Sequence, residues 1–121
     1  MRLIAVALAL VAPPVAAAPI SYRCSFPKVI TIDRGLQDQD FAFTLAYDSV
    51  TKTAAMIGNN GVSTLQVYSG PDATSFLEFV ATGAVQTLTM LPSGAAVYSR
   101  HTLWPGDDGF VASQQYGSCK P

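Results

Sequence analysis

The chain has 121 residues, of which half are hydrophobic and 12% are charged, with a formal net charge of −1 at pH 7. This length leaves room for one domain, and a mildly acidic chain without a basic run argues against nucleic acid or an anionic lipid surface as the partner. One histidine and two cysteines are also too few ligands for a structural zinc site.

The first 18 residues have the features of a removable signal peptide. A positive Arg2 precedes an unbroken apolar run over residues 3–11, and small residues follow up to Ala18. The apolar run is too short to span a bilayer, which takes about 20 residues. We therefore expect a leader over 1–18 that is cleaved near Ala17 or Ala18.

The remaining residues, 19–121, have no second candidate for a membrane span, no internal repeat and no linker, so we expect a single domain. Cys24 and Cys119 are the only cysteines and lie near its two ends. An exported chain is expected to pair them, and closing so long a loop would contribute roughly 4–5 kcal/mol by restricting the unfolded chain. The predicted product is a monomer in the periplasm or outside the cell, closed by a Cys24–Cys119 bond.

Apolar and polar residues alternate along this domain between short turn signals, and no stretch has helical periodicity. An Asp- and Gly-containing loop is expected over 33–40, and Asn60-Gly61 is the strongest hairpin signal because this dipeptide readily takes positive φ. The expected strands are 21–26 continued by 28–32, then 41–47, 53–57, 62–68, 75–81, 84–91, 95–103 and 110–116.

About eight short strands joined in sequence by tight turns favour an antiparallel meander. Such a sheet avoids exposed edges by closing into a barrel or by splitting into a two-sheet sandwich. A bond between the first and last strands is what closure requires, so we predict an all-β, closed or nearly closed barrel, with the sandwich as the alternative. Its core is expected to contain Phe41, Phe43, Tyr47, Leu88 and Met90.

His101 is the only histidine, and Asp107, Asp108 and several serines could supply the parts of a Ser-His-Asp hydrolase. The chain has no Gly-x-Ser-x-Gly turn around a nucleophile. On a strand, Arg100 and His101 also point to opposite faces, which argues against a joint active site. We favour a surface histidine and predict no catalytic residue.

Glu78 is the only glutamate, and it lies between Leu77 and Phe79 in an apolar strand. If those two neighbours face the core, Glu78 faces water, which we favour because charged side chains are seldom buried. In the opposite orientation Glu78 lies inside and needs a partner such as Arg100 or Arg23. A glycosidase would need a second acid opposite it, and the sequence identifies none.

Tyr98, Arg100 and Trp104 are residue types that anchor interfaces. Trp104 before Pro105 would equally serve to plug one end of a barrel. The acidic residues in the loops lack the Asp-x-Asp-x-Asp-Gly order of a calcium site, so we predict no metal and no other cofactor.

Two resemblances accompany these features. The ends Tyr22-Arg23-Cys24 and Cys119 resemble those of the periplasmic C-type lysozyme inhibitors, which are small disulfide-bonded β-barrels with a Ser-Gly-x-x-Tyr loop that enters the lysozyme cleft. Here Tyr98 follows Ser93-Gly94 with one residue too many, and residues 104–106 replace the Lys-Gly element of the family. The resemblance implies that Ser93 and Tyr98 would contact lysozyme.

The second resemblance is to small exported bacterial proteins without an assigned function, which are similar in residues 76–78, 82–87, 99–102 and 113–119.

The leading hypothesis is a non-enzymatic, exported binding or inhibitor-type barrel whose partner is a protein or a cell-envelope component, for example a cell-wall-degrading enzyme. One alternative is a lipocalin-like carrier of a small apolar ligand, which requires a cavity. The other is a small hydrolase that uses His101. The candidate binding residues are Glu78, Ser93, Tyr98, Arg100, His101 and Trp104.

Overall fold

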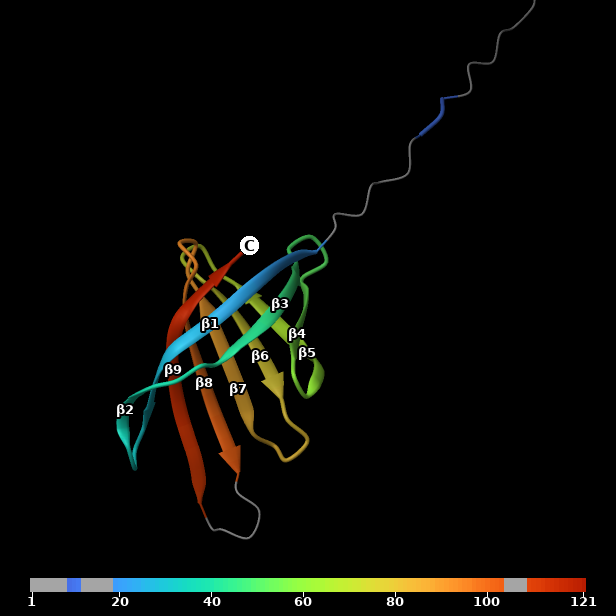
Figure 1. The fold of residues 1–121 in the computed structure, drawn as a ribbon. Helices are drawn as coiled ribbons and strands as arrows, with labels where there is room; N and C mark the ends of the chain where they lie inside the picture. The colour runs from blue at the N-terminus through green and yellow to red at the C-terminus, as the bar shows by residue number, and fades with distance from the viewer. Residues whose placement is uncertain (1–8, 12–18, 104–108) are drawn as a thin grey trace, which may run out of the picture.

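The computed structural model describes residues 9–11, 19–103 and 109–121, and these ranges contain nine β-strands and no helix. Eight strands close into an antiparallel barrel, because β1 pairs with β9 as well as with β3, and one extra strand, β2, is added beside β1 (Figure 1). The predicted closed barrel is therefore confirmed over the sandwich. The strands are β1 (Ile20–Thr31), β2 (Gly35–Asp38), β3 (Ala42–Asp48), β4 (Thr53–Gly58), β5 (Gly61–Ser69), β6 (Thr74–Phe79), β7 (Val85–Met90), β8 (Ala95–Leu103) and β9 (Phe110–Lys120).

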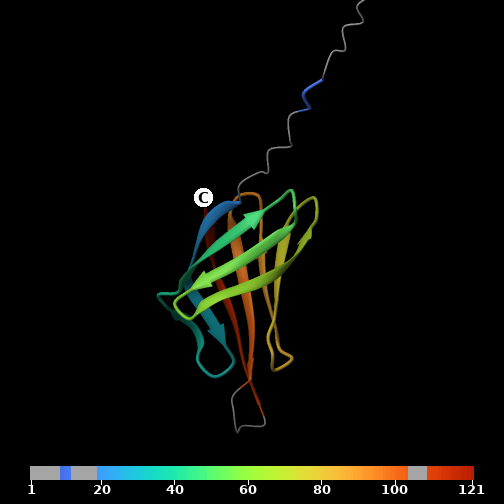
Figure 2. The ribbon, with the colours of Figure 1, turned by 90° about the vertical axis from the view of Figure 1, so that its right-hand side faces the viewer.

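Strand β1 joins the two expected runs at the start of the domain into one strand of 12 residues. Its first half pairs with β3, its second half with β2, and its other edge with β9. The register with β9 shifts between Ser25 and Lys28, around Pro27. Proline has no N–H for the ladder and is tolerated at such a bulge. After the bulge, β1 continues from the barrel wall into a hairpin with β2 (Figures 1 and 2).

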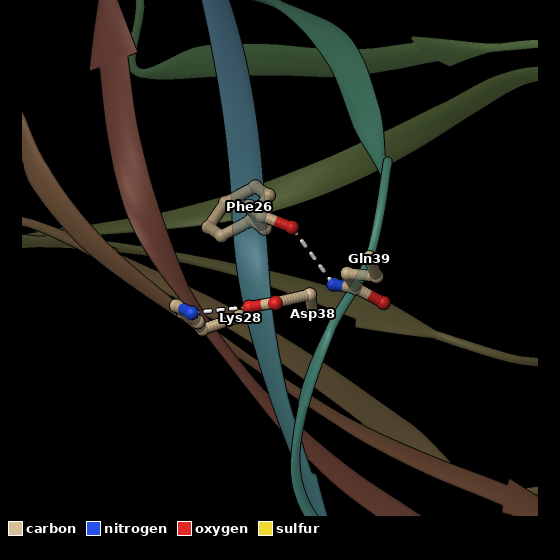
Figure 3. A network of polar contacts seen from close by, with 4 residues as sticks. All are labelled: Phe26, Lys28, Asp38 and Gln39. Atoms are coloured by element: carbon tan, nitrogen blue, oxygen red, sulfur yellow. Dashed lines mark hydrogen bonds and ion pairs between the residues drawn. The ribbon is translucent and has the colours of Figure 1, made fainter.

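The loop expected over 33–40 is partly wrong, because residues 35–38 form β2. All four residues of β2 are exposed, whereas each of the other strands has at least one buried position. Two side-chain contacts attach it to β1 (Figure 3). Lys28 Nζ forms an ion pair with Asp38, and the Gln39 side-chain amide donates to the Phe26 carbonyl over 2.9 Å.

Side chains pack the middle of the barrel. Phe26 lies against Phe43 and Tyr98, with ring centroids 5.5 and 5.9 Å away, and Tyr47 meets Phe76 edge to face at 5.1 Å. The predicted core positions are confirmed as buried or as packed against the buried cluster. The buried hydrophobic residues are Cys24, Phe26, Phe43, Leu45, Tyr47, Ala54, Leu65, Phe76, Leu88, Ala96, Tyr98 and Cys119.

The closure of the barrel is both hydrogen-bonded and covalent. Cys24 on β1 stands directly opposite Cys119 on β9, and the predicted bond between them is confirmed. Beside it, β9 passes so close to the β1 bulge that a Cβ on Gly117 would lie 1.9 Å from the Ser25 carbonyl oxygen. Only glycine fits there, because both strands contribute backbone that the barrel holds in place.

Of the predicted leader, the structure describes residues 9–11, which belong to no strand and expose Leu10 and Val11 almost completely. The predicted cleavage site lies outside the described residues. In the described ranges, no helix has the length and apolar character needed to cross a bilayer.

Candidate functional site

One end of the barrel contains a cavity of about 360 Å³ that gathers charged and aromatic side chains. This end, called the mouth below, is where β4 turns into β5 and β6 turns into β7; it lies at the bottom of the barrel in Figure 1. Because the middle of the barrel is packed, the mouth cavity is a bowl rather than a deep channel. Its aromatic residues are Phe41, Phe43 and Tyr98, and its charged residues are Asp40, Glu78 and Arg100.

Tyr98 forms the floor of the mouth cavity. Its side chain points inward from β8 and is 2% exposed, and its hydroxyl donates to Gln86 Oε1 over 2.6 Å. Burial raises the pKa of Tyr98 to about 12; nearby Arg100 opposes this rise and Glu78 adds to it. The phenol is therefore neutral at physiological pH. The Phe41 ring stacks parallel to it, with centroids 6.1 Å apart.

Arg100 lies two residues after Tyr98 and therefore on the same inner face of β8. Its guanidinium carbon is 5.8 Å from the centroid of the Phe41 ring and 5.9 Å from that of Tyr98, which is within the range of cation–π attraction. Its Nε atom is buried and has no hydrogen-bond partner among the described residues. A buried donor without an acceptor is costly, so this side chain is suited to receive an acceptor from a ligand.

Glu78 lies on the inner face of β6. The expectation that Leu77 and Phe79 face the core and Glu78 points outward into water is therefore wrong. Phe76, two residues earlier on the same face, is 1% exposed, whereas Phe79 is 58% exposed on the outside. Phe76 fills the barrel and sets the orientation of β6, which places Glu78 at the mouth. In the described part of the chain, Glu78 forms no ion pair with either arginine that the sequence suggested. Its half-buried position at an open end allows it to remain unpaired.

A second hollow of about 320 Å³ adjoins the mouth cavity on the side of β1, β8 and β9. We call it the side hollow. Phe41 and Arg100 line both spaces and so form the boundary between them. Gln115 is 3% exposed, and its Oε1 accepts from Gln39 Nε2 over 2.8 Å. The other residues of the side hollow are Val29, Thr31, Thr102, Val111 and Ser113.

Sequence reasoning named three residues of this site, Glu78, Tyr98 and Arg100, but missed the residues that complete it. The sequence pattern predicts Phe41 only as a core residue and gives Gln86 no role, yet both line the mouth cavity. The two glutamines that bond across the side hollow, Gln39 and Gln115, were also missed. A glutamine that faces into the barrel is a signal for such a site, and it cannot be recognised until the inner face of each strand is known.

Ser93 and Tyr98, the two residues named by the resemblance, are not brought together. Ser93 is exposed in the turn between β7 and β8, at the end of the barrel opposite the mouth, where its Oγ accepts from the Ala95 N–H over 3.3 Å. Tyr98 is buried with its hydroxyl directed to the mouth. Trp104 lies outside the described residues.

His101 is exposed on the outer face of β8, so the prediction that it points away from Arg100 is confirmed. It lines an outer hollow of about 430 Å³ together with Ser99, which is on the same face. In the part of the chain that the structure describes, the imidazole takes part in no side-chain hydrogen bond and no salt bridge. Asp107 and Asp108 lie outside those residues.

Metal ligands do not gather in the described ranges: no group of three or more His, Cys, Asp or Glu side chains has the arrangement to hold an ion. The polar groups that do converge are the guanidinium, carboxylate, amide and phenol at the mouth. These groups can form hydrogen bonds and ion pairs with a bound molecule.

Comparison with known proteins assigns the chain to no family. No protein-family model, no curated protein and no solved structure matches it. A fold by itself does not specify a function, which depends on the side chains of the site.

Proposed function

We propose that this protein is a non-enzymatic, exported binding protein that takes a small ligand into the mouth of its barrel. The observation that carries the proposal is the mouth cavity of about 360 Å³, in which an aromatic floor lies beside the unpaired Arg100 Nε. Small-molecule sites are typically concave and combine apolar side chains with polar groups that converge on the ligand. Glu78 and Gln86 are among the other polar groups that converge there.

Export is supported by the disulfide between Cys24 and Cys119, which fits an oxidising compartment. The positive residue, apolar run and small residues at the start of the chain support the same location.

The mouth favours a small-molecule carrier over an inhibitor that acts through its turns. Inhibition of a cell-wall-degrading enzyme was expected to use Ser93 and Tyr98 together, but Ser93 is exposed in a turn at the end opposite the mouth, whereas Tyr98 is buried inside the barrel and 2% exposed. The packed middle of the barrel also limits the size of the ligand that a carrier could hold. The ligand would bind at the rim and would not be fully enclosed as it is in the wider barrel of a lipocalin. The ligand is therefore small and only partly enclosed.

The test is a titration of the oxidised protein with N-phenyl-1-naphthylamine, an uncharged dye that fluoresces in apolar sites. We expect saturable binding of one dye per chain, with amide chemical-shift changes in residues that line the mouth such as Phe41 and Gln86. Removing the Phe41 ring in Phe41→Ala is expected to weaken binding about tenfold, which is the scale of a lost aromatic contact.

The matched control is Phe79→Ala, which removes an identical ring from the outer face of β6, where Phe79 is 58% exposed. Binding to this variant should equal that of the parent protein. Absence of saturable binding, shift changes confined to the outer face, or equal losses in the two variants would each refute the proposed function.

A further inference from the structure

We propose that the natural ligand is a small organic anion whose carboxylate, or comparable anionic group, binds Arg100 from the side hollow. This inference rests on the proposed function, because it assumes that the mouth holds a ligand. The ligand is thereby assigned a chemical class and a side of Arg100 from which its anionic group binds.

The charges around Arg100 are unevenly placed. Toward the mouth cavity the guanidinium shares its surroundings with two carboxylates, those of Asp40 and Glu78. Toward the side hollow, Arg100 is the sole charged residue among the described residues of the lining. An anionic group is therefore repelled from the mouth side and attracted on the side of β1 and β9.

Residues that can donate hydrogen bonds to an anion also line the side hollow. The Arg100 Nε–H is buried and has no acceptor among the described residues. Ser113 stands directly opposite Arg100 in the pairing of β8 with β9, and its side chain lines the same hollow, as does that of Thr102. A planar guanidinium beside hydroxyl groups matches the geometry of a carboxylate, to which arginine donates two parallel hydrogen bonds.

The apolar part of the ligand has a defined place as well. Phe41 lies on the boundary between the two spaces, and its ring is stacked on that of Tyr98. An apolar body attached to an anionic group at Arg100 would lie along Phe41 and reach into the mouth cavity. Donor groups on that body would face Glu78 and the Gln86 amide. The ligand thus combines one anionic end with an apolar or mixed body.

The experiment compares three molecules of nearly equal size and different charge: 3-phenylpropionate, 3-phenylpropionamide and 3-phenylpropylamine. Dissociation constants are measured by amide chemical shifts of the oxidised protein at neutral pH. We expect the carboxylate to bind at least tenfold more tightly than the amide, and the amine to bind most weakly. The shift changes of the carboxylate should include Ser113 and Val111 of the side hollow.

Two substitutions locate the preference. Arg100→Gln is expected to bring the carboxylate to within twofold of the amide, with the affinity of the amide unchanged. Arg23→Gln, which removes an exposed arginine from the barrel wall, should leave the preference intact. If Arg100→Gln does not fold, Arg100→Lys replaces it; because lysine keeps the charge but lacks the planar fork, the preference should shrink without disappearing.

Equal binding of the three molecules, tighter binding of the amine, or a preference that survives in Arg100→Gln would each overturn the anionic ligand. In those cases, binding of N-phenyl-1-naphthylamine at the mouth leaves the proposed function standing. If neither the dye nor any of the three molecules binds, both proposals fall. Binding of the dye without binding of any of the three overturns the anionic ligand alone.

Discussion

At the scale of single residues, Tyr98 shows how burial in the barrel changes the properties of a side chain that lines the mouth. The hydroxyl is buried, yet it keeps a partner in Gln86, and its oxygen lies 3.8 Å from the Met56 sulfur. A buried phenol with a hydrogen-bond partner can remain in an aromatic core without a large desolvation cost. Tyr98 thus joins the packed core to the polar rim where Arg100 and Glu78 lie.

The raised pKa of Tyr98, about 12 against an ordinary 10.0, predicts a loss of stability in alkali. Between these values the unfolded chain releases the phenol proton while the native protein retains it, so the native state binds more protons and stability falls as pH rises. The contribution is complete below about pH 10 and is lost as the pH passes through about 12. Over this range, the unfolding free energy of the parent should decline by up to about 2–3 kcal/mol more than that of Tyr98→Phe.

Urea denaturation of the two proteins at a series of alkaline pH values measures this difference. The two proteins are compared by the slope of their unfolding free energy against pH. Their absolute stabilities differ, because Tyr98→Phe also removes the hydrogen bond to Gln86 and so starts from a lower stability. Parallel slopes above about pH 10 would contradict the assignment of a raised pKa to a buried Tyr98.

At the scale of elements, the change of partner within β1 determines the shape of the mouth. The first half of the strand belongs to the barrel wall, and the second half carries β2 outward. The side hollow forms along this second half, since Val29 and Thr31 of β1 line it beside residues of β8 and β9. Asp38, the last residue of β2, and Gln39 after it both connect this segment to the barrel. The Lys28–Asp38 ion pair is exposed, whereas the Gln39 side-chain amide donates hydrogen bonds to both β1 and β9.

The close approach of β9 to the β1 bulge predicts that Gly117→Ala is strongly destabilising. The added Cβ would meet backbone atoms, the Ser25 carbonyl oxygen at 1.9 Å and the Phe26 Cα at 2.8 Å, so one strand must move. We expect a loss of about 2–4 kcal/mol in unfolding free energy, the range of a severe backbone or overpacking conflict.

The control for this change is Gly58→Ala at the end of β4, where an added Cβ meets no atom within 4 Å. Both variants are compared with the parent by urea denaturation followed by circular dichroism. A Gly117→Ala protein as stable as Gly58→Ala would show that β1 and β9 do not approach so closely at the bulge.

At the scale of the whole molecule, the barrel closes between the first and last strands, which are also the strands joined by the disulfide. Cys24 and Cys119 are 95 residues apart in the chain, and the hydrogen bonds between β1 and β9 bring them into register. The same closure places Arg100 and Ser113 beside residues of β1 around one hollow. The covalent bond and the candidate site therefore depend on the same pairing of strands.

Loss of the disulfide is expected to lower the unfolding free energy by roughly 4–5 kcal/mol, through the greater freedom of the unfolded chain. A small domain has about 5–15 kcal/mol in total, so this is a large share. The measurement is urea denaturation of the double variant Cys24→Ser/Cys119→Ser against the oxidised parent. A change below about 1 kcal/mol would mean that the hydrogen bonds between β1 and β9 close the barrel without covalent help.

The sequence by itself determined the all-β class, the approximate strands and the pairing of the cysteines. The cysteine pairing follows from the presence of only two cysteines in the chain. The class and the strands follow from local signals, which are alternation with a period of two and turns such as Asn60-Gly61. The same alternation put Tyr98 and Arg100 on one face and His101 on the other. Such signals are contained within a few neighbouring residues, so no knowledge of the rest of the fold is required.

Only the tertiary structure decided which face of each strand is inside. Phe76 and Phe79 are both apolar and lie on opposite faces of β6, so the segment by itself allows either orientation for Glu78. The barrel selects the orientation in which Phe76 fills its interior, and Glu78 is thereby brought to the mouth. Phe41 and Arg100 meet there although 59 positions separate them, because the order of strands around the barrel, which no short segment encodes, sets their distance.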